Sequence, residues 1–140
     1  MMPDTGQSLS LTAESASVKV ASDFIRRGAE RAGLPPQRLS ELDLIVEELL
    51  MNVVRYAYPA DSRGLVEITY SIPQACCLRV EIADQGVEFN PLELAEPELG
   101  SSLEERPVGG LGVFLIRHYA DSLHYRRDGA WNRVLFSVCG

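Results

Sequence analysis

The sequence predicts an α/β protein, a two-layer sandwich in which three helices cover one face of a mostly antiparallel, mixed sheet of about five strands. Two kinds of periodicity support this prediction. Apolar residues recur every three or four positions in three segments, which is typical of amphipathic helices. In shorter segments they alternate with polar residues, as in strands with one buried face. Two pairs of these short segments are joined by turn-forming residues, and each pair is expected to form an antiparallel hairpin.

The first part of the chain is predicted to supply one edge strand and two helices. Residues 1–8 are polar and expected to be flexible, and residues 9–12 alternate like a short strand. A helix is expected from about residue 14 to residue 32, where Gly33 can end it. Two prolines then lead into a second helix over residues 35–58.

The second part is predicted to supply two hairpins around a third helix. The first hairpin consists of strands at residues 66–72 and 78–84, with a turn at Pro73-Gln74. After the third helix, over residues 111–121, strands at 122–127 and 131–138 flank the turn residues Asp128-Gly129. The third helix is expected to direct four side chains inward: Leu111, Phe114, Leu115 and Tyr119.

Composition indicates a single domain, assigned to residues 9–140. Hydrophobic residues make up 46% of the 140 residues and charged residues 24%, an ordinary balance for a globular protein. No apolar run approaches the roughly 20 residues of a membrane span, and the first residues lack a signal pattern. A cytoplasmic protein with no membrane contact is therefore expected.

The net charge of −7 argues against general nucleic-acid binding, which needs a basic surface. The charge fits a protein whose macromolecular partner is another protein. Three cysteines, Cys76, Cys77 and Cys139, form neither an even framework nor a metal-ligand spacing. They are interpreted as reduced packing residues.

The second helix carries a polar pair within its apolar pattern. Glu48 and Asn52 lie four residues apart, so both side chains project from the same side of a helix. An amide oxygen can ligate a hard cation, and a carboxylate can accept a proton. The alternative interpretation is a polar stripe on an amphipathic helix.

Two later segments also combine polar or glycine residues with element ends. Asp84 and Gly86 stand where the strand at 78–84 should end. Gly109, Gly110 and Gly112 open the third helix, where backbone N–H groups and the helix dipole favour anions. Each pattern also has a simple structural explanation, a turn after a strand or glycines used for packing.

The order of these motifs resembles the ATPase superfamily that contains gyrase, histidine kinases and mismatch-repair proteins (GHKL). Within it, the segments ELLMN, IADQGVEFNP, LEERPVGGLGVFLIR and DGAWNRVLF are similar to the small single-domain branch of anti-sigma-factor serine kinases. The resemblance extends from about residue 9 to residue 138. It implies a Bergerat-type ATPase fold that binds ATP and Mg²⁺.

The resemblance also implies roles for individual residues. Glu48 is expected to be the catalytic base, Asn52 the Mg²⁺ ligand, and Asp84 the acceptor for the adenine amine. The remaining nucleotide-binding candidates are Arg55, Gly86, Phe89, Arg106, Gly109, Gly110, Leu111 and Gly112.

This chain departs from the superfamily pattern at two positions. Glu88 stands where a second glycine is common, and the last strand has no Thr near the expected adenine. Asn132 offers a polar group in that strand. Residues 90–108 are expected to be either a solvated loop or a nucleotide lid with Arg106 turned inward.

The resemblance implies a serine protein kinase that binds a sigma factor and phosphorylates a STAS-type anti-anti-sigma protein, with a tendency to form homodimers. The alternative is a nucleotide-dependent binding module with negligible turnover. A histidine-kinase fragment is disfavoured, because the chain has only His118 and His124 and no preceding phosphoacceptor helix pair.

Overall fold

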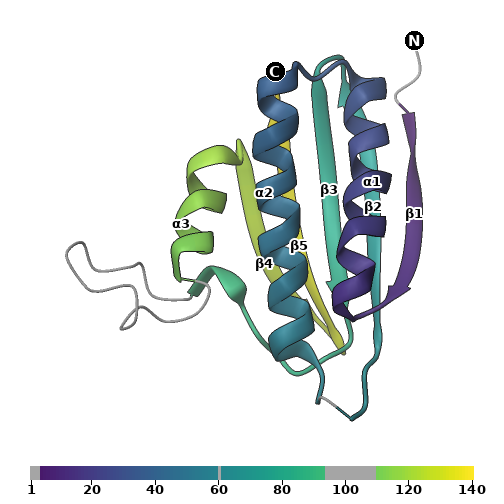
Figure 1. Cartoon of the computed structure of the whole chain (residues 1–140), viewed down its shortest axis with the longest axis vertical. Helices are drawn as coiled ribbons and strands as arrows, with labels where there is room; N and C mark the ends of the chain where they lie inside the picture. The colour runs from purple at the N-terminus through teal and green to yellow at the C-terminus, as the bar shows by residue number, and fades with distance from the viewer. Residues whose placement is uncertain (1–3, 60, 94–109) are drawn as a thin grey trace, which may run out of the picture.

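The computed structural model describes residues 4–59, 61–93 and 110–140, and its described part confirms the predicted two-layer fold (Figure 1). The elements are, in chain order, β1 (Asp4–Thr12), α1 (Ser15–Ala32), α2 (Pro36–Asn52), the π-helical turn η1 (Val53–Ala57), β2 (Leu65–Gln74), β3 (Cys77–Asp84), the 3-10 turn η2 (Pro91–Glu93), α3 (Gly110–Tyr119), β4 (Ser122–Asp128) and β5 (Trp131–Cys139).

The sheet has the strand order β1-β2-β3-β5-β4, and each of these neighbouring pairs is antiparallel. The expected mixed character is therefore absent from the described strands. β5, the last strand, lies between β3 and β4, so the end of β3 faces the start of β5. Asp84 consequently lies directly opposite Asn132, and Cys77 opposite Cys139.

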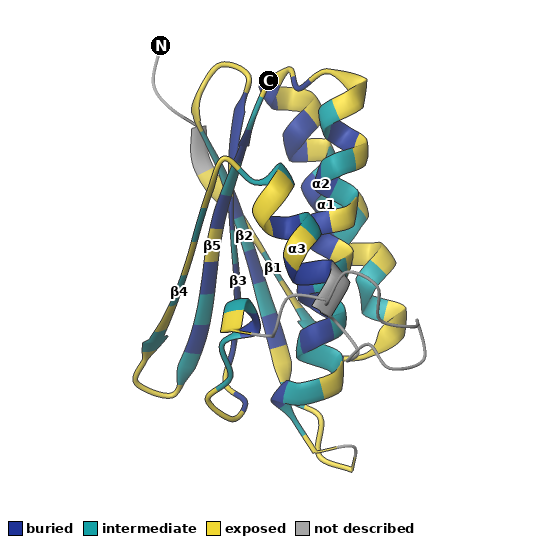
Figure 2. Cartoon of the chain, turned by 90° about the vertical axis from the view of Figure 1, so that its left-hand side faces the viewer, coloured by how far each residue is buried: buried dark blue, intermediate teal, exposed yellow. Residues whose placement is uncertain are grey.

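All three α-helices cover one face of the sheet, as Figure 2 shows from the side. The buried residues of α2 recur every three or four positions and pack against the inward-facing residues of the central strands. The core consists chiefly of Ala21, Ile25, Leu42, Ile45, Val46, Leu49, Ile68, Val80, Ile82, Ile116 and Phe136. The other face of the antiparallel sheet has no covering helix among the described residues.

Element ends agree with the local signals in several places. Gly33 caps α1 in the left-handed conformation with φ 89°, and Pro36 is the first residue of α2. β1 begins at Asp4, earlier than predicted, so residues 4–8 belong to a strand rather than a flexible end. β2 also continues through the predicted Pro73-Gln74 turn.

The second helix changes its geometry at Asn52. Regular α-helix ends there, and a π-helical turn continues to Ala57. π-helical turns are rare in proteins, and those that occur are often found at functional sites. The predicted helix is thus present almost to its expected end at residue 58, but its last turn is wider than an α-helix.

The predicted inward face of α3 is wrong at Phe114. That side chain is 49% exposed, whereas Val113 and Ile116 are fully buried. Tyr119 packs partly against the core, as expected. Because apolar residues occupy almost every position of this short helix, their spacing does not define a unique buried side.

The interpretation of all three cysteines as reduced is also wrong. Cys77 and Cys139 form a disulfide, and only Cys76 is a free, exposed cysteine. The two bonded cysteines are 62 residues apart in sequence, but β5 brings them directly opposite each other across the sheet. The strand order brings these two cysteines together, and the spacing of the cysteines in the sequence does not reveal that order.

Arg38, in the first turns of α2, ties the helical layer to the end of the sheet. Its guanidinium donates to Glu41 Oε1 (2.7 Å) and Asp121 Oδ2 (2.6 Å), and to the carbonyls of Tyr119 and Cys139 (both 3.0 Å). These contacts join the start of α2 to the end of α3. Since α3 packs beside α2, its first turn lies toward the other end of α2, where Glu48 and Asn52 are found (Figure 1).

Most of the expected lid at residues 90–108 lies outside the described residues. Its first part contains η2, which α3 contacts through a hydrogen bond from the Arg117 guanidinium to the Leu92 carbonyl. Among the described residues, none of the helices combines the length and the hydropathy of a membrane-spanning helix.

Candidate functional site

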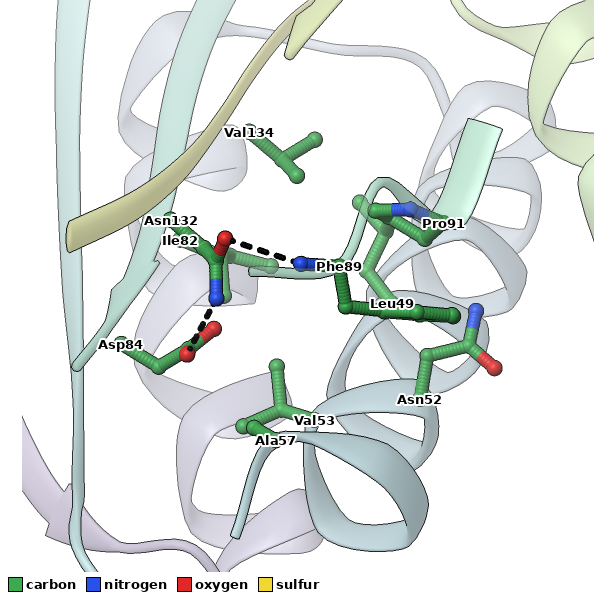
Figure 3. Close-up of a pocket in the computed structure, with 10 residues that line it drawn as sticks. All are labelled: Leu49, Asn52, Val53, Ala57, Ile82, Asp84, Phe89, Pro91, Asn132 and Val134. Atoms are coloured by element: carbon green, nitrogen blue, oxygen red, sulfur yellow. Dashed lines mark hydrogen bonds between the residues drawn. The ribbon is translucent and has the colours of Figure 1, made fainter. Parts of the chain in front are cut away.

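A pocket lies where the end of α2 and η1 meet the end of β3 and the start of β5 (Figure 3). The space between its atoms, part of it open to solvent, is about 340 Å³. Its walls are mostly apolar, and the lining residues are Leu49, Asn52, Val53, Ala57, Ile82, Asp84, Phe89, Pro91, Asn132 and Val134.

Asp84 supplies the carboxylate of this pocket. It is the last residue of β3, and only 5% of its surface is exposed. Its Oδ1 accepts hydrogen bonds from Asn132 Nδ2 and from the Gly86 backbone N–H, both at 2.9 Å. Among the described residues, none donates to Oδ2. This second oxygen is available to a donor on a ligand.

The environment of Asp84 raises the pKa of its carboxyl group. Burial is the largest cause, because it penalises the charged form. The hydrogen bonds from Asn132 and Gly86 and the charge of Arg127 oppose this rise. These hydrogen-bond donors therefore offset part of the free-energy cost of placing a charged Asp84 carboxylate in an apolar pocket.

Gly86 packs closely against the end of η1. A Cβ built on Gly86 would lie 2.1 Å from the carbonyl oxygen of Ala57. The same carbonyl accepts a hydrogen bond from the Val87 N–H at 2.9 Å. Glycine thus allows the loop after β3 to contact the end of η1 directly, at Ala57, which lines the pocket.

Phe89 lines the pocket at the other end of this loop. Its backbone N–H donates to Asn132 Oδ1 at 3.2 Å, and its ring lies 4.9 Å from the Tyr56 ring, centre to centre. Glu88, which replaces the common second glycine, is exposed. The departure at Glu88 therefore does not fill the pocket.

Asn52 lies at the junction of α2 and η1, on the pocket wall. Its side chain is buried, with 1% exposed surface, but neither Oδ1 nor Nδ2 has a hydrogen-bond partner among the described residues. Buried amides are nearly always paired, so a buried amide without a partner in a pocket indicates a ligand contact.

Glu48 lies one turn earlier and contacts the first turn of α3. A Cβ built on Gly112 would lie 2.0 Å from Glu48 Oε2, so any larger residue would displace this carboxylate from its observed position. Oε2 is buried and has no hydrogen-bond partner among the described residues. Glu48 and Asn52 are therefore both unsatisfied, and the glycine-rich start of α3 lies against Glu48.

The other predicted binding residues have varied positions. Gly110 is the first residue of α3, as expected for a glycine that opens a helix. Arg55 is exposed and has no ion pair among the described residues. The side chain of Leu111 is not described, and Arg106 and Gly109 lie outside the described residues.

Asn132 is the main residue whose importance the sequence patterns did not establish. Its amide contacts Asp84 and the loop at Phe89, and it is 3% exposed. A signal was present: Asn132 precedes Val134, Phe136 and Val138 at alternating positions of β5, so a polar residue occupies the buried face.

These contacts give the pocket two chemically different ends. One end has apolar walls and a fixed carboxylate oxygen, which suits a flat ring with an amine group. At the other end, Asn52 presents an unpaired amide. One turn earlier on α2, the unpaired Oε2 of Glu48 lies against the start of α3, a helix end whose N–H groups favour anions. The arrangement can hold a ligand that combines an aromatic amine with an anionic group.

A family model described as a histidine kinase-like ATPase domain matches residues 11–138. The serine/threonine-protein kinase BtrW of Bordetella bronchiseptica is 30% identical over 93 residues, covering 66% of this chain and 65% of that protein. The serine-protein kinase RsbW of Listeria innocua is 30% identical over 104 residues, covering 71% and 66%. The chain thus matches slightly less than two thirds of the length of these relatives.

Solved structures share the fold at low sequence identity. The RsbU and RsbW domains of a Mycobacterium tuberculosis protein match 96% of this chain and 32% of that chain, with TM-score 0.67 and 11% identity. The histidine kinase domain of a blue-light activated kinase from Erythrobacter litoralis matches 89% and 59%, with TM-score 0.53 and 21% identity. These likenesses support the fold.

Proposed function

Because this chain belongs to the histidine kinase-like ATPase domain family, we propose that it is an ATP-dependent serine protein kinase that acts as an anti-sigma factor. It would transfer the γ-phosphate of ATP to a serine of a STAS-type anti-anti-sigma protein, in the cytoplasm and as a homodimer. One observation carries the proposal. The unsatisfied side chain of Glu48 lies against the glycine-rich start of α3, and the unsatisfied side chain of Asn52, one turn later, shares a pocket with Asp84.

The apolar end of the pocket would bind adenine. Asp84 Oδ2 would accept a hydrogen bond from the exocyclic amine, while Ile82, Val134 and Phe89 contact the ring. This placement directs the phosphates away from the carboxylate of Asp84. It also uses the one Asp84 oxygen that has no donor among the described residues.

The residues at the other end fit a magnesium ion. Asn52 Oδ1 is a buried amide oxygen without a partner among the described residues. Mg²⁺ prefers oxygen ligands, and in nucleotide sites these come from both the protein and the substrate phosphates. Asn52 would hold the ion, which when bound would offset negative charge on the phosphates. Gly112 lets the start of α3 approach Glu48, and the N–H groups of this helix start would favour phosphate oxygens there.

Glu48 would act as the general base of phosphoryl transfer. The serine hydroxyl oxygen forms a bond to the γ-phosphorus as the bond between that phosphorus and the bridging oxygen of ADP breaks. The hydroxyl proton moves to the Glu48 carboxylate, and ADP leaves with the electron pair of the broken bond. An unpaired carboxylate oxygen is available for this proton in the described structure.

Replacement of Glu48 tests the proposal. Glu48→Gln should retain ATP binding in calorimetry and lose at least about 100-fold in phosphate incorporation into STAS-type proteins from the same organism. Glu47→Gln is the matched control, because Glu47 is the adjacent exposed carboxylate. It should transfer phosphate normally.

The outcomes separate the kinase from its alternative. Normal transfer by Glu48→Gln would exclude Glu48 as the base. ATP-dependent association of the wild-type chain with its partners, without phosphate incorporation, would favour a nucleotide-dependent binding module instead. No ATP binding by the wild-type chain would refute both functions.

A further inference from the structure

The buried amide of Asn132 uses all four of its hydrogen-bonding positions. Nδ2 donates to Asp84 Oδ1 at 2.9 Å and to the Val87 carbonyl at 2.7 Å. Oδ1 accepts from the Phe89 N–H at 3.2 Å and from the Tyr125 hydroxyl at 2.7 Å. An asparagine side chain offers two donors and two acceptor sites, so this set is complete.

This complete set determines the orientation of the amide. If the amide were turned over, its NH₂ group would face the N–H of Phe89, and its oxygen would face the carbonyl of Val87. Both contacts would then be repulsive or unpaired. This is costly for Asn132, because only 3% of its surface is exposed to solvent. The hydroxyl of Tyr125 adds a second donor on the oxygen side.

The orientation of the amide has a direct consequence for Asp84. Oδ1 receives two donors, from Asn132 and from the Gly86 backbone, while Oδ2 receives none among the described residues. The carboxylate therefore presents one acceptor in one position. Figure 3 shows the chain of contacts from the Phe89 backbone through Asn132 to Asp84 at the edge of the pocket.

We propose that Asn132 is a positioning residue for base recognition: it holds Asp84 so that only Oδ2 faces the ligand. The Phe89 N–H and the Val87 carbonyl fix the amide orientation that this requires, and the Tyr125 hydroxyl supports it with a further hydrogen bond. The proposal rests on the ATP-binding function proposed above and extends it to residues outside the predicted site. Asn132 also holds the backbone at Val87 and Phe89, so the carboxylate and the adjoining pocket wall are positioned together.

The same hydrogen bond favours the charged form of the Asp84 carboxyl group. It lowers the pKa of Asp84 against the rise caused by burial, together with the Gly86 N–H and the charge of Arg127. The other titratable groups that interact with this region are Tyr58 and Tyr125, whose pKa values are both raised by burial, and Glu88 beside Tyr125. Both tyrosines are thus neutral where Asp84 titrates.

Removal of the amide should therefore change a titration as well as an affinity. In Asn132→Ala, carboxyl-carbon NMR of the free protein should give a higher pKa for Asp84 than in the wild type. Calorimetry with ATP should show an affinity at least about tenfold weaker at pH 7, with the acid loss of binding moved to higher pH. A purely structural role for Asn132 would not move this pH midpoint.

Tyr125→Phe is the milder second variant, and it keeps the folded state testable if the alanine variant does not fold. It removes one hydroxyl and should weaken ATP binding about threefold to tenfold. Tyr119→Phe is the matched control, because the Tyr119 ring packs partly against the core outside the pocket. Its ATP affinity should equal that of the wild type.

The results also separate this inference from the proposed function. Unchanged Asp84 pKa and ATP affinity in Asn132→Ala would overturn the inference while ATP binding by the wild type still supports the function. If only Tyr125→Phe folds, ATP binding within twofold of the wild type would overturn the inference. If the wild type binds no ATP, the proposed function fails, and the base-recognition role of Asn132 fails with it.

Discussion

Replacement of Gly112 by alanine tests whether the carboxylate of Glu48 must occupy its observed position. The added Cβ would lie 2.0 Å from Glu48 Oε2 and 2.4 Å from its Cδ. Real Cβ contacts are essentially never below 3.0 Å, so the carboxylate oxygen must move by about 1 Å or more. The end of a flexible side chain can make this movement without a change in the backbone.

Gly112→Ala is expected to change the stability little and the rate of phosphate transfer strongly. Alanine is a better helix former than glycine by up to about 1 kcal/mol, which offsets the cost of moving the side chain. The melting temperature should therefore change by no more than about 3 °C. Misplacement of a reacting group by about 1 Å can lower the rate about 100-fold, so phosphate transfer should fall by a factor of that order.

The assay compares four proteins: wild type, Gly112→Ala, Glu48→Ala and the double variant. Phosphate incorporation into a STAS-type protein gives the rate, calorimetry gives the ATP affinity, and thermal denaturation gives the stability. Gly112→Ala should bind ATP within about fivefold of the wild type, because Asp84 and the apolar walls are unchanged.

The double variant decides the mechanism. If alanine acts only by displacing Glu48, then Gly112→Ala has no further effect on the rate once Glu48 is already alanine. A transfer rate near that of the wild type in Gly112→Ala would refute the argument. An equal further loss in the Glu48→Ala background would refute it as well, because the glycine would then act independently of the carboxylate.

Three further predictions concern the pocket and the sheet. Asp84→Asn should weaken ATP binding by about tenfold to 100-fold, because an NH₂ donor replaces the ligand-facing oxygen, as measured by calorimetry. Because burial raises the pKa of Asp84, its neutral carboxyl group stabilises the folded state. This contribution is complete below the ordinary aspartate pKa and is lost as the pH rises through the raised pKa. Urea denaturation should therefore show Asp84→Asn gaining stability relative to the wild type over that pH range. Gly86→Ala should lower the free energy of unfolding by about 1–3 kcal/mol, because its Cβ would meet the Ala57 carbonyl at 2.1 Å. Reduction of the Cys77–Cys139 disulfide, which spans 62 residues, should lower it by about 4 kcal/mol on the chain-entropy estimate.

Controls distinguish these effects from general damage. Asp61→Asn replaces an exposed carboxylate and should change neither ATP affinity nor the pH dependence of stability. Cys76→Ser removes the free thiol and should leave the sensitivity to reductant intact. A urea midpoint that does not respond to reductant would contradict the disulfide. A Gly86→Ala variant as stable as the wild type would contradict the close contact at η1.

Local patterns predicted the elements well because they depend on neighbours in sequence. Gly33 ends α1 and Pro36 begins α2 through their own backbone preferences. Alternation identified β5 as a strand with one buried face, although it did not establish what Asn132 does there. In α3 helical spacing wrongly placed Phe114 inward, because apolar residues occupy almost every position of this short helix.

The candidate site was predicted in its motifs and not in its contacts. Glu48, Asn52 and Asp84 were selected from position and residue type, and the structure places them around one end of the helical layer. The contact of Glu48 with Gly112 depends on how α3 packs beside α2, which no local pattern specifies. Their proposed chemical roles await the experiments above.

Periodicity, capping and turn chemistry act over a few residues, so they specify which helices and strands this chain forms, their order, and the polar residues at their ends. The position of β5 between β3 and β4 depends instead on contacts between segments far apart in the chain. That placement makes Asn132 a neighbour of Asp84 and joins Cys77 to Cys139. The physical reason is that strand pairing and helix packing join residues far apart in sequence, and the free energy of burying the whole core selects which of them meet.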